Sequence, residues 1–177
     1  PVVDIAMPDP TVIKAADGYF YVYATESTRN VPIMKSKDLV EWTYCNTAFT
    51  NKTRPRFEPK AGIWAPDINY INGKYVLYYA MSVWGGEQTC GIGVATANSP
   101  QGPFTDHGKM FRSNEIGVQN SIDPSLLQYQ GRNYLVWGSF RGIYVIELTT
   151  DGLSIMPGAK KKRIAGTAFE AVYIHKH

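Results

Sequence analysis

The sequence has few charged residues, few cysteines and no long apolar run. Charged residues make up 19% of its 177 residues, and the formal net charge of +3 is too small to favour nucleic acid as a partner. The only dense basic run, Lys160 to Arg163, is typical of a solvated turn. No apolar stretch approaches the roughly 20 residues that a membrane helix needs, so we expect no membrane span.

Metal-ligating and disulfide-forming residues are equally scarce. The two cysteines, Cys45 and Cys90, have no metal-type spacing and are too few to assign a redox compartment; they either pair or stay free. The three histidines, His107, His175 and His177, also lack a ligand spacing. The residues themselves therefore predict no metal site.

Helical periodicity is absent over any useful length, whereas aromatic residues are abundant. They make up 13% of the sequence, with 12 Tyr and 4 Trp, and this content favours β structure. Hydrophobic residues reach 44%, which is ordinary for a folded protein with a buried core. We therefore expect one all-β domain over residues 1–177.

A repeated hairpin opening organises the chain, and its clearest copy is the stretch Asn120 to Gly142. Asp123-Pro124 precedes an apolar run from Ser125 to Tyr129, a Gly-containing turn, and a second run from Tyr134 to Trp137. Two apolar-rich segments around such a turn predict a β-hairpin. Three further copies open with an acidic residue: Asp9, Asp67 and Glu170.

Two more strand-like runs follow each complete hairpin. The third runs cover residues 31–35, 91–96 and 142–148, and the fourth cover residues 42–49, 104–111 and roughly 161–165. The opening acids are 58, 56 and 47 residues apart. Four strands per repeat of this length are typical of β-propeller blades. A β-sandwich is the alternative, but it does not explain the regular acidic starts. We predict blade 1 at about 9–50, blade 2 at about 64–112, blade 3 at about 120–166, and blade 4 starting near 168.

Four carboxyl groups should meet on the propeller axis. The first strand of each blade lies nearest the axis, so matching positions converge there. We therefore expect one axial pocket in which clustered like charges raise the pKa of at least one carboxyl group. The alternative is that these acids bond nearby backbone N–H groups beside turns. The four residues are Asp9, Asp67, Asp123 and Glu170.

Two tryptophans are candidates for stacking on a sugar ring. Trp64 lies just before the second acidic start, and Trp84 lies in the loop after the second hairpin. Loops on a rigid scaffold often carry binding residues. Packing within or between blades is the competing interpretation for both.

Four motifs occur in order along essentially the whole chain: Asp9–Ile13 (DPTVI), Trp64–Ile68 (WAPDI), Ser121–Leu126 (SIDPSL) and Phe169–Ala171 (FEA). Together they resemble glycoside hydrolase family 43, and most closely its arabinan-degrading members. Gly138–Phe140, Gly142-Ile143 and Ser36–Trp42 strengthen the likeness.

The resemblance implies a five-bladed propeller and an inverting glycosidase acting on arabinose- or xylose-containing plant polysaccharides. It assigns Asp9 as the general base, Glu170 as the general acid, and Asp123 as the third carboxylate, which orients the acid and keeps it protonated. Asp67 would be an axial structural or substrate-positioning residue. The substrate-binding candidates are Trp64, Asp67, Trp84, Asn120, Ser139 and Phe140.

Two features depart from the family pattern. The family's usual Glu-Ala-Pro is here Glu170-Ala171-Val172, with the acid intact. The chain also holds three blades and only the first strand of a fourth, so about two blades, or about 100 residues at this period, are missing. We therefore expect a fragment of a longer chain. Family members often hold an axial calcium ion through a histidine of a later blade, so a structural calcium ion is an implication of the resemblance alone.

The leading hypothesis is a hydrolase of α-L-arabinofuranosidic linkages: an endo-arabinanase, an exo-arabinanase or an arabinofuranosidase. A β-xylosidase with the same carboxylates is the second enzyme hypothesis. A non-catalytic carbohydrate-binding or interaction propeller is the third, but a binding module does not need this trio of acids. No signal peptide is visible, and the polymer-sized substrate leads us to expect a secreted or periplasmic protein.

Overall fold

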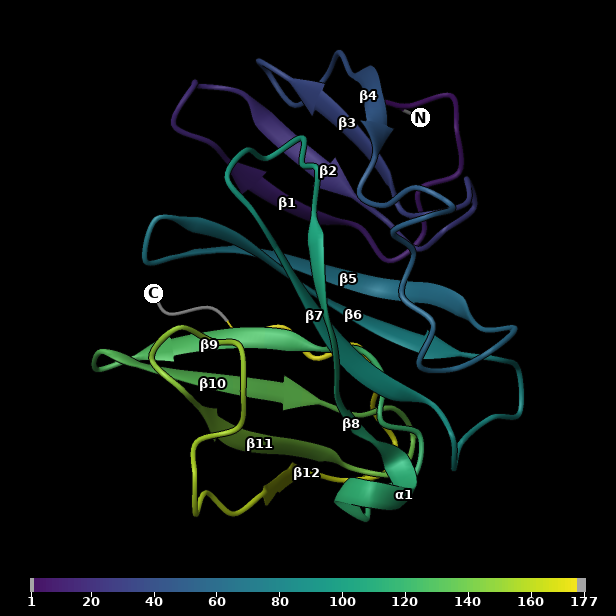
Figure 1. Cartoon of the computed structure of the whole chain (residues 1–177), viewed down its shortest axis with the longest axis vertical. Coiled ribbons are helices and arrows are strands. Elements are labelled where there is room, and N and C mark those ends of the chain that lie inside the picture. Colours follow the sequence, from purple (N-terminus) through teal and green to yellow (C-terminus); the bar gives the residue numbers. More distant parts are fainter. Residues whose placement is uncertain (1, 175–177) are drawn as a thin grey trace.

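The computed structural model describes residues 2–174, and its regular structure is three four-stranded antiparallel sheets and one helical turn (Figure 1). Within each sheet, every strand pairs with its neighbour in the chain. The first sheet holds β1 (Thr11–Lys14), β2 (Phe20–Tyr23), β3 (Pro32–Ser36) and β4 (Thr43–Thr47). The second holds β5 (Gly62–Ile71), β6 (Lys74–Ser82), β7 (Gly91–Ala97) and β8 (Thr105–Arg112). The third holds β9 (Ser125–Tyr129), β10 (Arg132–Trp137), β11 (Ile143–Leu148) and β12 (Lys162–Ala165).

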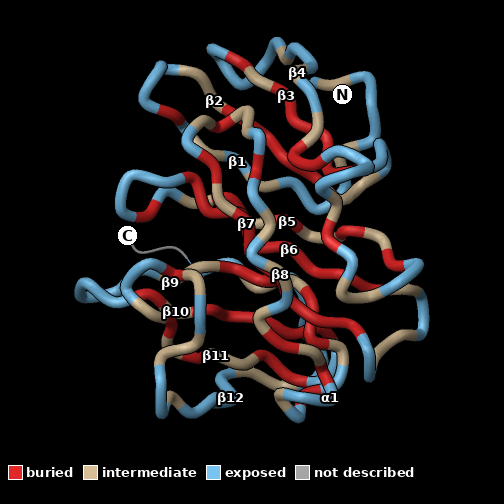
Figure 2. The backbone as a smooth tube through the Cα atoms, in the orientation of Figure 1, coloured by how far each residue is buried: buried red, intermediate tan, exposed pale blue. Residues whose placement is uncertain are grey.

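The sheets are arranged as successive blades of a propeller. Their first strands lie side by side, with β1 against β5 and β5 against β9 (Figure 1). The exposed positions gather in the turns, whereas the buried positions follow the strands between the blades (Figure 2). The predicted four-stranded repeat is therefore confirmed for three sheets.

Strand β6 forms the centre of the fold because both of its faces are buried. Alternate residues of a strand point to opposite faces. Leu77 and Tyr79 accordingly pack toward the first blade, and Val76 and Tyr78 pack toward the third. This explains why the strand's sequence is a continuous apolar run rather than an alternating one.

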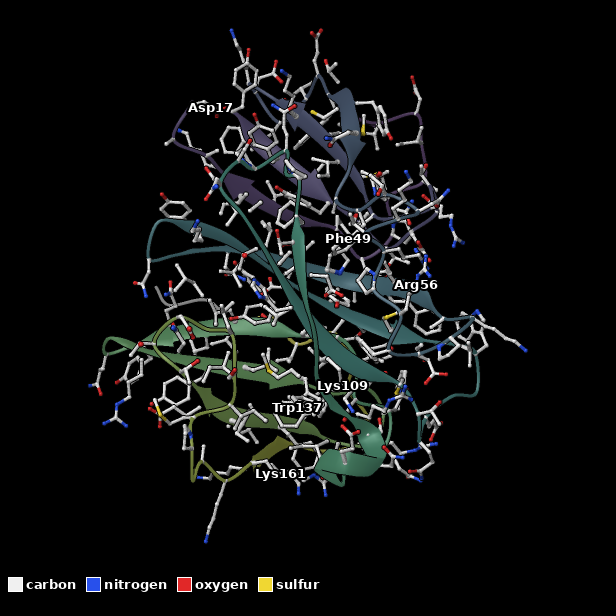
Figure 3. All side chains as sticks on the ribbon, viewed as in Figure 1. Asp17, Phe49, Arg56, Lys109, Trp137 and Lys161 are labelled. Carbon is white, nitrogen blue, oxygen red and sulfur yellow. The ribbon has the colours of Figure 1, made fainter. Side chains whose placement is uncertain are left out.

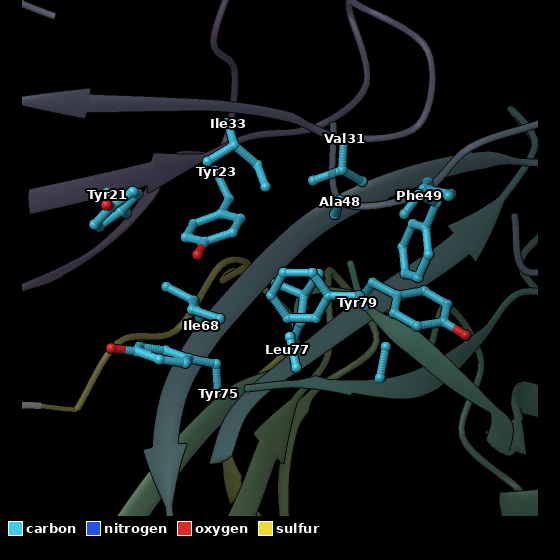
Figure 4. Packing of buried hydrophobic residues seen from close by; sticks show 14 of the residues in the cluster. Tyr21, Tyr23, Val31, Ile33, Ala48, Phe49, Ile68, Tyr75, Leu77 and Tyr79 are labelled. Atoms are coloured by element: carbon cyan, nitrogen blue, oxygen red, sulfur yellow. The ribbon is translucent and has the colours of Figure 1, made fainter. Parts of the chain in front are cut away.

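Aromatic rings fill the space between the first two blades. Tyr21 and Tyr23 of β2 contribute to this cluster together with Leu77 (Figure 4). The rings of Phe49 and Tyr79 meet edge-on with centroids 5.7 Å apart. Such edge-to-face pairs add to the stabilisation that burial of the rings provides.

Trp137 is the largest side chain buried between the second and third blades (Figure 3). Its ring lies 5.0 Å from that of Phe111 and 5.8 Å from that of Tyr144. Its Nε1–H donates to the hydroxyl of Ser121 at 3.1 Å, so burial leaves no polar atom of the indole unpaired.

Three details differ from the sequence-based expectation. β5 begins at Gly62, slightly before the predicted start of blade 2 at about 64, and one helical turn, α1 (Ser113–Ile116), follows β8. Residues 166–174, predicted to include the first strand of a fourth blade, form no strand. A strand needs ladder hydrogen bonds to a neighbour, and within residues 2–174 no second strand lies beside this segment.

Both cysteines are free: Cys45 is half-buried and Cys90 is buried. Of the three histidines, His175 and His177 lie outside the described residues. Within residues 2–174, no helix has the length and apolar character needed to cross a bilayer.

Replacing Trp137 with Ala should destabilise the fold by about 3–5 kcal/mol, because it leaves a cavity between two blades and removes a partner of Ser121. Chemical denaturation monitored by far-UV circular dichroism measures this loss. Trp84→Ala is the matched control, because Trp84 is 93% exposed and its removal should change the free energy of unfolding by less than about 0.5 kcal/mol. Equal effects of the two substitutions would contradict this description of the core.

Candidate active site

A cleft of about 1010 Å³ opens where the inner strands of the three blades meet. Residues from all three blades line it, together with residues 170–173, which follow β12. The cleft brings together all nine residues singled out from the sequence: Asp9, Trp64, Asp67, Trp84, Asn120, Asp123, Ser139, Phe140 and Glu170.

The four acids do not occupy one matching backbone position, contrary to the prediction. The matching positions are Asp9, Ala65 and Asp123, which have left-handed φ angles of 48°, 39° and 57° and each precede a proline. Asp67 lies two residues after Ala65. A bulge separates Trp64 from Asp67, and regular pairing of β5 with β6 begins again at Asp67. Glu170 lies one residue before Ala171, whose φ is 50°. The backbone conformation, not the acidic side chain, is therefore what repeats.

Left-handed backbone is concentrated at the cleft. Of the twelve non-glycine residues with positive φ among residues 2–174, six line it. Such conformations are costly for side chains other than glycine, and they cluster at functional sites. The six residues are Asp9, Ala65, Asn120, Asp123, Phe140 and Ala171.

The carboxylates of Asp9 and Glu170 are exposed to the cleft, and each accepts a hydrogen bond from a hydroxyl group. Thr25 Oγ1 donates to Asp9 Oδ2 at 2.6 Å. Ser139 Oγ donates to Glu170 Oε2 at 3.2 Å. Both hydroxyl residues follow the second strand of their blade, so the same part of two blades supports an acid.

Asp123 is half-buried, and its carboxyl group is close enough to Asp9 and Glu170 to be influenced by their charges. Burial raises its pKa, and the charges of Asp9 and Glu170 raise it further, to about 6. A hydrogen bond from the Ala171 amide to Asp123 Oδ2, at 3.3 Å, acts in the opposite direction. The same bond ties Asp123 to the residue next to Glu170.

Asp67 connects the inner strands rather than facing the other acids. Its Oδ2 accepts from the Leu126 amide of β9 at 2.7 Å and from Asn69 Nδ2 at 2.7 Å, and the Thr11 hydroxyl of β1 also contacts it. Burial raises the pKa of Asp67 to about 6 in spite of these hydrogen bonds. The carboxyl group therefore joins all three blades.

Aromatic side chains form the walls of the cleft. The rings of Trp64 and Trp84 lie 5.4 Å apart at 50°. Trp64 also packs against Ala80, Cys90 and Ile122, whereas Trp84 is almost fully exposed. Trp64 thus has a packing role as well as a cleft-facing one, and Trp84 is free to contact a ligand.

Two loops are tied together at the edge of the cleft. Asn120 Nδ2 donates to the carbonyl of Ser139 at 3.0 Å, and the Phe140 amide donates to the carbonyl of Phe169 at 2.9 Å. Arg141 forms a two-point ion pair with Glu87, with contacts of 3.0 and 2.8 Å. These contacts hold the segment that carries Ser139 and Phe140 against its neighbours.

Sequence reasoning missed Thr25 and the Glu87–Arg141 pair. Thr25 follows an aromatic strand just as Ser139 does, so its place after that strand was the available signal. Glu87 and Arg141 are 54 residues apart, and nothing in a single sequence connects them.

The cleft can support acid–base chemistry on a bound sugar. It offers two exposed carboxylates, a third carboxyl group that holds its proton to about pH 6, and aromatic faces. Within residues 2–174, no three His, Cys, Asp or Glu side chains are arranged to hold a metal ion.

Comparison with known proteins assigns the class. The family model of the glycosyl hydrolases family 43 matches residues 1–177. The chain therefore belongs to glycosyl hydrolase family 43, a family of glycosidases.

Several of the proteins that it resembles are named as arabinan-degrading enzymes. The chain is 38% identical over 140 residues to the extracellular endo-α-(1→5)-L-arabinanase 1 of Bacillus subtilis, covering 75% of this chain and 43% of that protein. It is 32% identical over 178 residues to a probable arabinan endo-1,5-α-L-arabinosidase C of Aspergillus niger, covering 96% and 55%. The Cellvibrio cellulosa α-L-arabinanase complexed with arabinohexaose superposes with a TM-score of 0.79 at 28% identity, covering 92% and 54%. The chain spans about half the length of these relatives.

The raised pKa of Asp67 predicts a pH-dependent stability difference. Between its unfolded value of 3.8 and its folded value of about 6, folded Asp67 keeps a proton that the unfolded chain has released. Its contribution to stability is therefore full below about pH 4 and is lost as the pH rises through 6. Relative to Asp67→Asn, which does not titrate, the wild-type protein should lose about 1–3 kcal/mol between pH 4 and pH 7.

Urea denaturation at a series of pH values measures this difference. Asp4→Asn, at an exposed position outside the cleft, serves as the control and should run parallel to wild type. A wild-type minus Asp67→Asn difference that stays constant with pH would contradict the assignment.

Proposed function

We propose that the protein is an arabinan hydrolase that cleaves α-1,5-linked L-arabinofuranosyl residues by inversion. The single observation that carries the proposal is the meeting of Asp9, Asp123 and Glu170 in one aromatic-walled cleft of a family 43 chain. The names of the relatives above support arabinan as the substrate and endo action as the mode.

Asp9 acts as the general base in this proposal. One of its oxygens accepts the Thr25 hydroxyl hydrogen bond, and within residues 2–174 no protein group bonds the other oxygen, Oδ1. Oδ1 is therefore available to a water molecule. Asp9 removes a proton from that water as it attacks the anomeric carbon from the face opposite the leaving group.

Glu170 acts as the general acid and donates its proton to the leaving glycosidic oxygen. Inversion requires the acid and the base to stand about 6.5–9.5 Å apart, so that water and sugar fit between them. Asp9 and Glu170 line the same cleft from different parts of the chain, the segment before β1 and the segment after β12.

Asp123 keeps a proton within the trio. Burial raises the pKa of Asp123, and the charges of Asp9 and Glu170 add to this rise, so that the pKa reaches about 6. The Ala171 amide bond to Asp123 also fixes the backbone beside Glu170. Asp123 therefore orients the acid.

The remaining cleft residues bind the polysaccharide. Trp64, Trp84 and Phe140 offer apolar faces to arabinofuranose rings, and Asn120 and Ser139 shape the wall beside the acid. We further propose that the whole protein is a five-bladed propeller. It acts outside the cell, as the extracellular Bacillus subtilis relative does.

Asp9→Asn and Glu170→Gln should each lower kcat on linear arabinan by about 10²–10⁴-fold, because each removes one of the two proton transfers. A reducing-end assay measures turnover, and Glu41→Gln, an exposed acid outside the cleft, is the matched control. Turnover close to wild type in either variant would remove that residue from its role.

The anomeric configuration of the first product, followed by proton NMR, tests inversion separately. The same preparations incubated with xylo-oligosaccharides test the β-xylosidase alternative. Binding of arabinan with no new reducing ends between pH 5 and pH 8 would favour a non-catalytic binding propeller.

Trp84→Ala should raise KM about fivefold and change kcat little, because a lost aromatic contact of about 1 kcal/mol weakens binding remote from the reacting bond. Tyr44→Ala removes an exposed ring outside the cleft and is the control. An unchanged KM in Trp84→Ala would exclude Trp84 from the binding surface.

A further inference from the structure

Thr25 links Asp9 to the inner strand of the next blade. Its hydroxyl oxygen lies 2.6 Å from Asp9 Oδ2 and 2.7 Å from the amide nitrogen of Ala65. Its own amide donates to the carbonyl of Pro8 at 2.9 Å. The backbone of Thr25 therefore holds the segment before Asp9. Its hydroxyl oxygen bonds both the Asp9 carboxylate and the Ala65 amide of β5.

The direction of these hydrogen bonds is fixed by chemistry. The Ala65 amide can only donate, so the Thr25 oxygen accepts there. The single hydroxyl proton is then directed to Asp9 Oδ2. A hydrogen bond to a charged acceptor is stronger than one between neutral groups.

A buried ion pair with Arg54 anchors Glu26, the residue that follows Thr25. The side chains of Glu26 and Arg54 are only 10% and 8% exposed. Glu26 Oε1 accepts from the Ile63 amide at 3.0 Å, and the Glu26 amide donates to the Ile63 carbonyl at 3.1 Å. Arg54 Nη2 also donates to the carbonyl of Ala61 at 2.9 Å. Residue 26 is thus fixed to the start of β5 by both its backbone and its side chain.

The ionised state of Glu26 is secured within this network. Burial alone would raise its pKa, but the hydrogen bonds from Arg54 and from the amides of Asn30 and Ile63 hold the pKa below its ordinary value. A charged, fully paired group of this kind fixes geometry because any displacement breaks several bonds at once.

We propose that Thr25 is the positioning residue of Asp9, and that the Glu26–Arg54 pair, bonded to the start of β5, holds Thr25 in place. The inference rests on the proposed function, in which Asp9 is the general base. Thr25 occupies one carboxylate oxygen and aims the other at the attacking water, and its bond to Ala65 couples this orientation to the segment that carries Trp64 and Asp67.

Thr25→Val and Thr25→Ser separate this role from simple packing. Valine keeps the shape of threonine and loses the hydroxyl, whereas serine keeps the hydroxyl and loses the methyl group. We expect Thr25→Val to lower kcat on linear arabinan about tenfold to 100-fold with KM changed less than about threefold, since a misplaced base affects the reaction more than binding. Thr25→Ser should stay within about threefold of wild type.

Thr47→Val is the matched control, because it removes a threonine hydroxyl on β4 that donates to the Phe49 carbonyl at 2.6 Å, outside the cleft. It should leave kcat unchanged. Thr25→Ala, which also lacks the hydroxyl, replaces Thr25→Val if the latter does not fold.

Amide hydrogen exchange at Ala65, followed by NMR, tests the same link without any substrate. Exchange should be at least about tenfold faster in Thr25→Val than in wild type or Thr25→Ser, because the amide loses its acceptor. Wild-type turnover of arabinan that persists in Thr25→Val would overturn the inference while leaving the proposed function intact. If the wild-type protein hydrolyses no arabinan, the proposed function fails. The hydrogen-exchange experiment still tests the link by itself: equal exchange of the Ala65 amide in wild type and Thr25→Val would overturn the inference.

Discussion

The carboxyl group of Asp67 is the constraint on which the arrangement of the cleft depends. It receives hydrogen bonds from β5 and β9 and contacts Thr11 of β1, so the inner strands of all three blades meet at one desolvated group. Asp9 and Asp123 lie just before β1 and β9, and Trp64 lies within β5. Thr25 and Ser139 follow β2 and β10, the strands that pair with β1 and β9. Burying an ionisable group costs free energy unless the group is hydrogen-bonded. The hydrogen bonds to Asp67 reduce this cost and at the same time fix the three inner strands relative to one another.

Much of the fold follows from local sequence pattern. Alternating or continuous apolar runs separated by Gly- and Asn-containing turns predicted the strands, and the period near 50 residues predicted the repeated sheets. The doubly buried β6 is visible as an unbroken apolar run. Residues 166–174 form no strand, because pattern marks a segment's tendency to be extended whereas a strand also requires a partner. The start of β5 was missed because a bulge separates Trp64 from Asp67 and interrupts the alternation.

The composition of the cleft could be predicted more fully than its geometry. Acids near strand starts and aromatics in the loops identified nine lining residues. The sequence reasoning aligned the acids with one another, however, and so placed Asp67 in the same position as Asp9. The true repeat is a left-handed residue before a proline, and side-chain identity does not reveal φ. Thr25 escaped notice because its importance lies in two hydrogen bonds to residues 16 and 40 positions away.

The repeated left-handed position has an evolutionary consequence. Each blade presents one side chain to the axis from the same backbone geometry, and that side chain is an aspartate in the first and third blades but an alanine in the second. Because the fold specifies the position and not the chemistry, duplication of an ancestral blade would supply several equivalent axial positions at once. Selection could then change the residue at one position without rebuilding the others. An asymmetric site can thereby arise from a repeated scaffold. In the second blade the matching position holds Ala65 and therefore contributes no carboxyl group to the cleft.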